Sequence, residues 1–430
     1  MSAGGAARGI RGWELAAGVL VACALAARLH NAVAFPPLRD FDGAPHALSV
    51  FALYEGHLPD PRTWAGFHPP LYYALGAAAW RLAPEAIPVH VLLRLLSALA
   101  GFGALALAWR TLARFAPRED AAVVAAVAAC APVFALATSM IGNETLCALF
   151  ATVALSRLCA PPSNPRALGR HALGVGLLSG LAALSKSTGL AVIAASVAAL
   201  AWRARAYGRP ALRAALVAGG VAAVVCAPFY VWLLVETGSP RALVGGGRPA
   251  DAAGSEMSAQ LPGERHIADY LALPPAMLAA PVKDAPGMLR SVPGLLYAST
   301  WADGHGQFLP ARVRTVLGAA SASAVLGLLP TVLVTVGAIA IARRRRDYAW
   351  AEAPLLFGAL LLAAFLVQTW VVPVYSAVKA SYLLSALLPA SICLAVGLER
   401  FGGRARTVLR AALLAIAAFD AGLTWYGWWS

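Results

Sequence analysis

A short polar stretch after the first long apolar run concentrates residue types that move protons and bind cations. It contains Arg39, Asp40, Asp42 and His46. Two carboxylates two residues apart beside an arginine can hold each other's pKa values apart and leave one ionised as a general base, or can share a divalent cation with the histidine. A second interpretation is that Asp40 and Asp42 cap a helix beginning near Pro45, since aspartate is common before a first-turn proline.

A histidine, two prolines and two tyrosines follow, as His68-Pro69-Pro70-Leu71-Tyr72-Tyr73. Proline disfavours the helical region for the residue before it, so His68 is also compatible with an ordinary extended entry to a helix. The tyrosine pair is likewise compatible with an aromatic belt at a membrane surface. Each of these residues alone is therefore ambiguous.

Charged residues recur at later points, each next to an apolar run. These charged residues are Glu144, Lys186 and Lys379. The runs around Lys186 are short, which places its ammonium slightly below the membrane surface, where a partner such as a phosphate is expected; a snorkelling lysine is the alternative. Trp301, Asp303 and His305 could contact a sugar or bind a metal, or could belong to an aromatic belt with a capped turn.

The composition places these residues in a membrane protein. Of the 430 residues, 60% are hydrophobic and 13% charged, which excludes an ordinary soluble domain. The net charge of +14 comes from arginines between apolar runs and not from a basic face, so no nucleic-acid partner is expected. The six cysteines lie inside apolar runs, which argues against disulfides and thiolate metal sites.

The apolar runs predict an all-α polytopic membrane protein. Crossing the hydrocarbon core needs about 20 apolar residues, and only helices satisfy the backbone there in a chain of this pattern. We expect about eleven spans, near residues 12–32, 89–113, 119–139, 144–160, 170–185, 188–203, 211–235, 313–341, 351–372, 377–398 and 405–427.

Positive charge sets the predicted orientation. If the apolar stretch 69–82 stays outside, the arginine-rich connections fall on the cytoplasmic side, as the positive-inside rule requires. The N-terminus is then cytoplasmic and the C-terminus extracytoplasmic. Two long extracytoplasmic loops result, residues 33–88 and 236–312, so the chain divides into an N-terminal catalytic module (1–235), an outer loop (236–312) and C-terminal helices (313–430).

These motifs, taken in order, resemble the GT-C superfamily, specifically bacterial protein-mannosyltransferase-like and aminoarabinose-transferase-like membrane glycosyltransferases (glycosyltransferase family 39-like). The ordered set is an acidic motif after the first span, Gly56-His57-Leu58-Pro59, and then His-Pro-Pro-Leu-Tyr-Tyr. Met140-Ile141-Gly142-Asn143-Glu144 resembles the family's second acidic position, and Leu184-Ser185-Lys186-Ser187-Thr188-Gly189 its Leu-x-Lys-x-Thr-Gly turn. Lys379 to Leu384 resembles the late Arg-Tyr-Leu element, with Ser381 in place of the arginine.

The resemblance implies roles for individual residues. Asp42 is the catalytic carboxylate and Asp40 its partner, although the family's usual second acid is here Gly43. The donor phosphate is bound by Lys186, Lys379 and Arg39, and the substrates by His46, His68, Tyr72, Asn143, Glu144, Trp301, Asp303 and Tyr382. A divalent cation, if used, has Asp42, His46, Asp303 and His305 as candidate ligands.

The expected activity is transfer of a sugar from a polyprenyl-phosphate donor to a hydroxyl of a glycan, lipid or protein acceptor, with inversion, at the outer face of a bacterial inner membrane. Two rivals stay open. A transporter of lipid-linked saccharides would have related halves and charges at the midplane. An O-antigen ligase or polymerase would rely on arginines in a large late loop.

Overall fold

The computed structural model describes residues 12–36, 41–63, 65–162, 164–240, 242, 262–306, 308 and 318–429. Two predicted site residues, Arg39 and Asp40, lie outside these ranges. Within them the regular structure is helical. The α-helices are α1 (Gly12–Ala34), α2 (Gly43–Tyr54), α3 (Leu71–Leu82), α4 (Val89–Leu112), α5 (Arg118–Cys130), α6 (Pro132–Ala137), α7 (Glu144–Cys159), α8 (Pro165–Ser185), α9 (Leu190–Trp202), α10 (Ala204–Tyr207), α11 (Arg209–Thr237), α13 (Ala276–Ala279), α14 (Val292–Trp301), α16 (Ala319–Leu326), α17 (Leu328–Arg343), α18 (Glu352–Val371), α19 (Leu387–Glu399) and α20 (Gly403–Trp429). Short 3-10 helices are η2 (Ser187–Gly189), η4 (Ile267–Tyr270), η5 (Ala349–Ala351), η6 (Tyr375–Ala377) and η7 (Ala380–Ala386).

The chain is a multi-pass membrane protein, in which eight described helical segments are long and apolar enough to cross a membrane. All eleven predicted spans coincide with helices, but three of them are shorter than a full crossing. The segment predicted at 119–139 is divided between α5 and α6, because Pro132 starts a new helix there. Helices α7 and α9 have 16 and 13 residues. The count of eleven crossings therefore stays a prediction.

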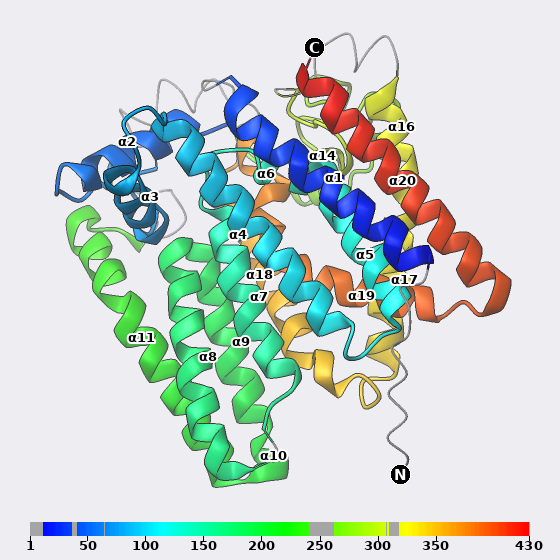
Figure 1. The fold of residues 1–430 in the computed structure, drawn as a ribbon. Coiled ribbons are helices and arrows are strands. Elements are labelled where there is room, and N and C mark those ends of the chain that lie inside the picture. The colour runs from blue at the N-terminus through cyan, green and yellow to red at the C-terminus, as the bar shows by residue number, and fades with distance from the viewer. Residues whose placement is uncertain are drawn as a thin grey trace.

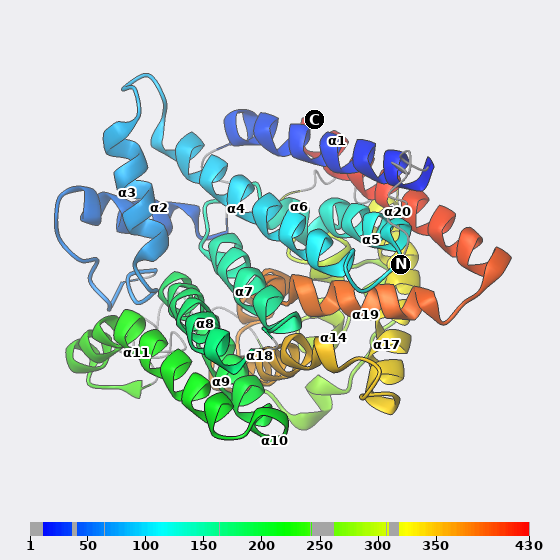
Figure 2. The ribbon, with the colours of Figure 1, turned by 60° about the horizontal axis from the view of Figure 1, so that its bottom comes forward.

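The helices form one bundle with the site at one end. In Figures 1 and 2, α7, α8, α9 and α18 stand side by side in the middle, α11 covers α8, and α1, α5 and α20 form a separate flank. Helices α2 and α3 lie across one end of the bundle, whereas α10 lies at the opposite end (Figure 1). The outer loop residues predicted to carry chemistry are thus separated from the arginine-rich connection at α10.

Close helix contacts are made through glycine. Helices α17 and α19 pack so tightly that a Cβ on Gly337 would lie 1.8 Å from the carbonyl oxygen of Cys393. A Cβ on Gly397 would lie 2.0 Å from the carbonyl oxygen of Leu333. In lipid, association depends on such van der Waals packing, because helices gain little from hiding apolar surface that is already in an apolar solvent.

A buried ionic cluster joins α5 to α20. The carboxylate of Asp120 is fully buried and receives hydrogen bonds from Arg406 and from Nε of Arg410, the latter at 2.7 Å. Arg410 also contacts Glu119, with 2.5 Å between Nη1 and Oε2. These arginines, which the positive-inside rule predicts to be cytoplasmic, therefore have a structural partner within the chain.

Helix α3 is the apolar segment whose crossing was in question. It has 12 residues, about 18 Å of helix, which is too short for the hydrocarbon core. It packs against α2 and α4, and the buried hydroxyl of Tyr72 donates to the carbonyl oxygen of Leu93 at 3.0 Å. The two short helices are thus part of the first outer loop and pack against each other, with α3 also against α4.

Candidate active site

A cavity of about 310 Å³ lies beside the start of α2 and the segment before α3. Its lining divides into a polar part and an apolar part. The polar part comes from the first outer loop, the start of α7 and the turn after α8, and the apolar part mainly from the start of α9, from α18 and from the segment that follows α18. The lining residues are Asp42, His46, Phe67, His68, Glu144, Lys186, Ser187, Thr188, Leu190, Ala191, Ala364, Gln368, Val372, Val374, Ser376, Ala377 and Tyr382.

Asp42 is the residue directly before α2, but its side chain is used elsewhere. Its backbone carbonyl accepts from the N–H of His46 at 3.0 Å, and within the described chain its carboxylate does not cap the helix. Instead Oδ2 of Asp42 accepts from Nζ of Lys379 at 3.1 Å. The capping interpretation is therefore wrong for this side chain, which turns away from the helix toward the cavity.

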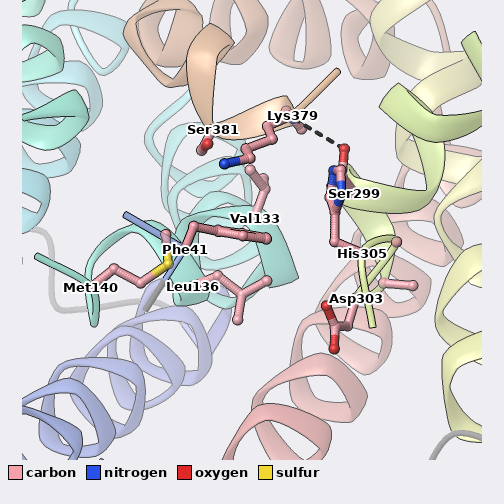
Figure 3. Close-up of a pocket in the computed structure, with 12 residues that line it drawn as sticks. Phe41, Val133, Leu136, Met140, Ser299, Asp303, His305, Lys379 and Ser381 are labelled. Carbon is pink, nitrogen blue, oxygen red and sulfur yellow. Dashed lines mark hydrogen bonds between the residues drawn. The ribbon is translucent and has the colours of Figure 1, made fainter. Parts of the chain in front are cut away.

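Lys379 reaches Asp42 from 337 residues later in the chain. Its ammonium lies 4.3 Å from the ring centroid of Phe41 and 5.8 Å from that of Tyr382. The backbone N–H of the next residue, Ala380, donates to the hydroxyl of Ser299 at 3.0 Å, which fixes the start of η7 (Figure 3). Aromatic faces and a carboxylate together compensate for the burial of this charge.

Lys186 and Glu144 form the second ion pair, with 2.6 Å between Nζ and Oε1. Lys186 follows the last residue of α8, and the turn to α9 closes there because the N–H of Gly189 donates to the carbonyl oxygen of Lys186 at 2.8 Å. A Cβ on Gly189 would lie 2.2 Å from the backbone of Ala182, so the turn requires glycine. This is the physical basis of the Lys-x-Thr-Gly pattern.

The two ion pairs share one aromatic side chain. The ammonium of Lys186 lies 4.4 Å from the ring centroid of Tyr382, the same ring that Lys379 approaches. Each acid is therefore balanced by one lysine, and both cations contact one ring. A phosphate in the cavity would meet positive charge that is already positioned and largely desolvated.

His46 forms part of a buried aromatic cluster next to Asp42. Its Nδ1 lies 2.7 Å from the hydroxyl of Tyr73, and its ring stacks on that of His68 at 5.6 Å between centroids. Tyr73 donates to the carbonyl oxygen of Ala65 at 3.3 Å, which makes Nδ1–H of His46 the donor and leaves Nε2 as an acceptor. Burial lowers the pKa of His46, so its imidazole is neutral at pH 7.

Asp303 and His305 lie near this site but face away from the main cavity. The carboxylate of Asp303 accepts from the backbone N–H of Phe308 at 2.7 Å, and Nε2 of His305 donates to the carbonyl oxygen of Val378 at 3.0 Å. Figure 3 shows both lining a smaller pocket with Lys379, with Asp303 on the far side of His305. His305 thus supports the backbone that carries Lys379, whereas Asp303 binds the backbone at Phe308.

The predicted metal ligands do not form a metal centre. Asp42 is paired with Lys379, and His46 and His305 are bonded to Tyr73 and to backbone. Among the residues that the structure describes, no three His, Cys, Asp or Glu side chains gather closely enough to hold a metal ion. Ammonium groups lie beside Asp42 and Glu144, and Asp303 accepts from a backbone N–H, so the described residues do not fit a divalent cation in this arrangement.

Three further predicted substrate-binding residues lie outside the wall of the main cavity, as Asp303 does. Trp301 packs against Gly327 and donates from Nε1 to the hydroxyl of Thr331 at 2.9 Å. Tyr72 is buried behind His46. Asn143 precedes α7, and within the described chain neither polar atom of its buried amide has a hydrogen-bond partner.

Four residues of the site were not predicted from the sequence to be site residues. Phe41 contacts Lys379, and Tyr73 contacts His46. Gln368 lines the main cavity, and Ser381 lines a smaller cavity beside it. For Phe41 and Tyr73, adjacency to predicted residues was an available signal. No local pattern marks Gln368, because it stands inside an apolar helix and only the packing of α18 against α9 turns it to the cavity.

The fold is similar to that of several solved structures. ArnT from Cupriavidus metallidurans in the apo state matches 96% of this chain and 75% of its own length, at 14% identity and a TM-score of 0.55. The same protein bound to undecaprenyl phosphate matches with a TM-score of 0.54 and 13% identity over 96% of this chain and 75% of that one. An oligosaccharyltransferase from Archaeoglobus fulgidus matches 97% of this chain and 56% of its own, at 14% identity and a TM-score of 0.52.

One protein family matches part of the sequence of this chain. Residues 68–232 match the family described as dolichyl-phosphate-mannose-protein mannosyltransferase. No curated protein sequence matches the chain significantly. The chain is a multi-pass membrane protein whose fold is similar to that of these solved structures. Its match to the mannosyltransferase family covers the segment from His68 to Trp232, which is less than half of the chain.

Proposed function

We propose that this enzyme transfers a sugar from a polyprenyl-phosphate carrier to an acceptor hydroxyl, with inversion at the anomeric carbon and Asp42 as the general base. The observation that carries the proposal is the composition of the cavity. One wall presents Asp42, Glu144 and Lys186, and the other is mostly apolar and is formed by the start of α9, by α18 and by the segment that follows α18. A lipid-phosphate donor is divided in the same way, because its head is charged and its isoprenoid tail is apolar.

Lys186 is the proposed ligand of the donor phosphate. Its ammonium lines the cavity, donates a hydrogen bond to Glu144 and lies over the ring of Tyr382. Leu190 and Ala191 begin α9 only a few residues later, so an isoprenoid chain leaving the phosphate would pass directly onto an apolar surface. A Cupriavidus metallidurans protein of the same fold has been crystallised with undecaprenyl phosphate, which supports this class of carrier.

Asp42 is the proposed base because its carboxylate lines the cavity and is more exposed than that of Glu144. Its side chain is about one-fifth exposed, at 22%, whereas the Lys379 side chain is 7% exposed, so the carboxylate is the accessible member of the pair. The proton of the acceptor hydroxyl passes to Asp42 while the oxygen attacks the anomeric carbon. The bond from that carbon to the phosphate oxygen breaks, and its electron pair stays on the phosphate. Attack opposite the leaving group inverts the configuration.

Substrate positioning falls to neighbours of Asp42. His46 and His68 line the cavity as a stacked pair, and the neutral imidazole of His46 can accept a hydrogen bond from a sugar hydroxyl. Tyr382 offers a ring face to the sugar or the phosphate. No step is assigned to a metal ion, since lysines already balance both acids.

The proposed site faces the extracytoplasmic side of a bacterial inner membrane, with the N-terminus in the cytoplasm and the C-terminus outside. The positive-inside rule supports this orientation, because α10 and the arginines around it lie at the end opposite α2 and α3. The acceptor is a hydroxyl of a glycan, a lipid or a protein. A transporter reading has less support: Glu144 begins α7 and Lys186 follows α8, so these charges lie at helix ends and not at a midplane.

The test is turnover by purified protein in detergent, with a panel of polyprenyl-phosphate sugars. Asp42→Asn keeps an oxygen that accepts from Lys379 but cannot take a proton, so we expect turnover to fall by about 100-fold or more with little change in Tm. Asp60→Asn is the matched control, because Asp60 lies in an exposed turn of the same loop.

Equal turnover by wild type and Asp42→Asn would remove Asp42 as the base. If wild type consumes no lipid-phosphate sugar while reconstituted vesicles move a lipid-linked saccharide across the membrane, the protein is a transporter.

A further inference from the structure

The choice of basic residue at the site differs from that in the rest of the chain. Lysine occurs at only three positions, Lys186, Lys283 and Lys379, and the other 31 of the 34 basic residues are arginine. Two of the three lysines pair with the acids at the cavity. Arginine offers a rigid planar fork that suits a fixed ion pair, whereas lysine is a compact charge on a flexible stem. The site therefore carries cations that can move.

The proposed reaction moves one negative charge across the site. Before transfer, Asp42 is a carboxylate and the donor phosphate is a diester with one negative charge. After transfer, Asp42 holds the acceptor proton and is neutral, and the carrier phosphate has gained the electron pair of the broken bond and a second negative charge. A cation fixed on Asp42 would thus be left beside a neutral acid at the moment when charge develops on the phosphate.

The geometry around Lys379 permits a change of partner. Its ammonium is 3.1 Å from Asp42, and the ring of Tyr382 lies 5.8 Å away, with Lys186 on the same ring at 4.4 Å. A small cavity lined by Asp42, Glu144, Lys379 and Tyr382 adjoins the main cavity, with which it shares all of these residues except Lys379. The path from Asp42 to the phosphate site is thus along an aromatic face, which stabilises a cation in transit.

We propose that Lys379 changes partner during the reaction: it holds Asp42 ionised before transfer and moves over Tyr382 to the leaving phosphate as Asp42 takes the proton. Lys186 stays on Glu144 and binds the phosphate throughout. The two lysines then have different kinetic roles, since Lys186 contributes in the ground state and Lys379 only as the bond breaks. This inference rests on the proposed function and goes beyond it in assigning the second cation.

The kinetic test compares Lys379→Met, Lys379→Arg and Lys186→Met in steady-state assays with a polyprenyl-phosphate sugar. For Lys379→Met we expect kcat to fall by about 100-fold with the donor KM changed less than about threefold, as for the loss of an interaction made only in the transition state. Lys379→Arg keeps the charge beside Asp42 but not the mobility, so Tm is retained while kcat falls by at least about tenfold. Lys283→Met is the control, because Lys283 contacts Tyr375 outside the main cavity.

A pH profile provides an independent readout. A carboxylate that loses its ammonium partner protonates more easily, so the acidic limb of kcat/KM moves to higher pH in Lys379→Met. The other titratable groups that face the pair are His46 on α2, Glu144 on α7, Lys186 after α8, His305 after α14 and Tyr382 on η7, and all of them are present in both proteins.

Two results would overturn the inference while leaving the proposed function intact: a raised donor KM with unchanged kcat in Lys379→Met, or full kcat in Lys379→Arg. The first would make Lys379 a simple phosphate ligand, and the second would make it a fixed charge. Failure of wild type to turn over any lipid-phosphate sugar would instead reject the proposed function itself.

Discussion

Nζ of Lys186 lies 2.6 Å from Oε1 of Glu144, so the turn after α8 is joined to the first residue of α7 at the wall of the cavity. The sequence predicted a phosphate partner for this lysine, because an unpaired ammonium at that depth is costly. The structure gives Glu144 as its partner within the chain. An ammonium has three N–H donors, so Lys186 can hold Glu144 and contact a phosphate at the same time.

Replacing Lys186 with methionine should therefore weaken donor binding specifically. The stem is kept and the charge removed, so we expect the donor KM to rise at least about tenfold, equivalent to about 1.4 kcal/mol. The measurement is steady-state kinetics with the donor varied and the acceptor saturating. Lys283→Met should leave the donor KM at the wild-type value, and a wild-type KM in Lys186→Met would place the phosphate elsewhere.

Much of the candidate site could be predicted from the sequence because charge in a membrane protein is confined to few places. Arginine counting alone placed Asp42, His68 and Glu144 on one side of the membrane, together with Lys186 and Lys379. These five residues lie at or beside one cavity in the structure. The positions of the long helices followed from the length of the apolar runs for the same reason.

The partners of the ion pairs and the directions of the side chains could not be predicted from the sequence, because they depend on contacts between distant segments. Nothing near Asp42 in the sequence indicates that its carboxylate turns to Lys379 and leaves the helix uncapped. Trp301 belongs to a local sequence typical of sugar contact, yet the packing of α14 against the start of α17 directs its indole to Thr331. The prediction of a single span at 119–139 was wrong for a related reason: Pro132 starts a new helix within an apolar run whose composition alone suggests one continuous span.

The glycine contact between α17 and α19 predicts a stability effect remote from the site. Gly337→Leu would force a side chain against the carbonyl oxygen of Cys393, which a Cβ would meet at 1.8 Å. We expect a loss of about 3 kcal/mol, seen as a lower Tm in detergent. Gly220→Leu is the matched control, because a Cβ there meets nothing within 4 Å. Similar Tm values for both variants would show that the helices do not meet at Gly337.

The buried imidazole of His305 predicts a loss of stability in mild acid. Burial, and secondarily the nearby Lys379, lower its pKa from 6.5 to about 3. The unfolded chain therefore gains a proton near pH 6.5 that the folded protein does not bind until about pH 3, so stability is lost as pH falls through this window. Between pH 6.5 and 5 the loss is about 2 kcal/mol.

His305→Gln retains a donor for the Val378 carbonyl but does not titrate, so its Tm should fall less than that of wild type between pH 7.5 and pH 5. The exposed His57 serves as control, and His57→Gln should follow wild type. Equal Tm losses in wild type and His305→Gln would mean that His305 is protonated in the folded protein.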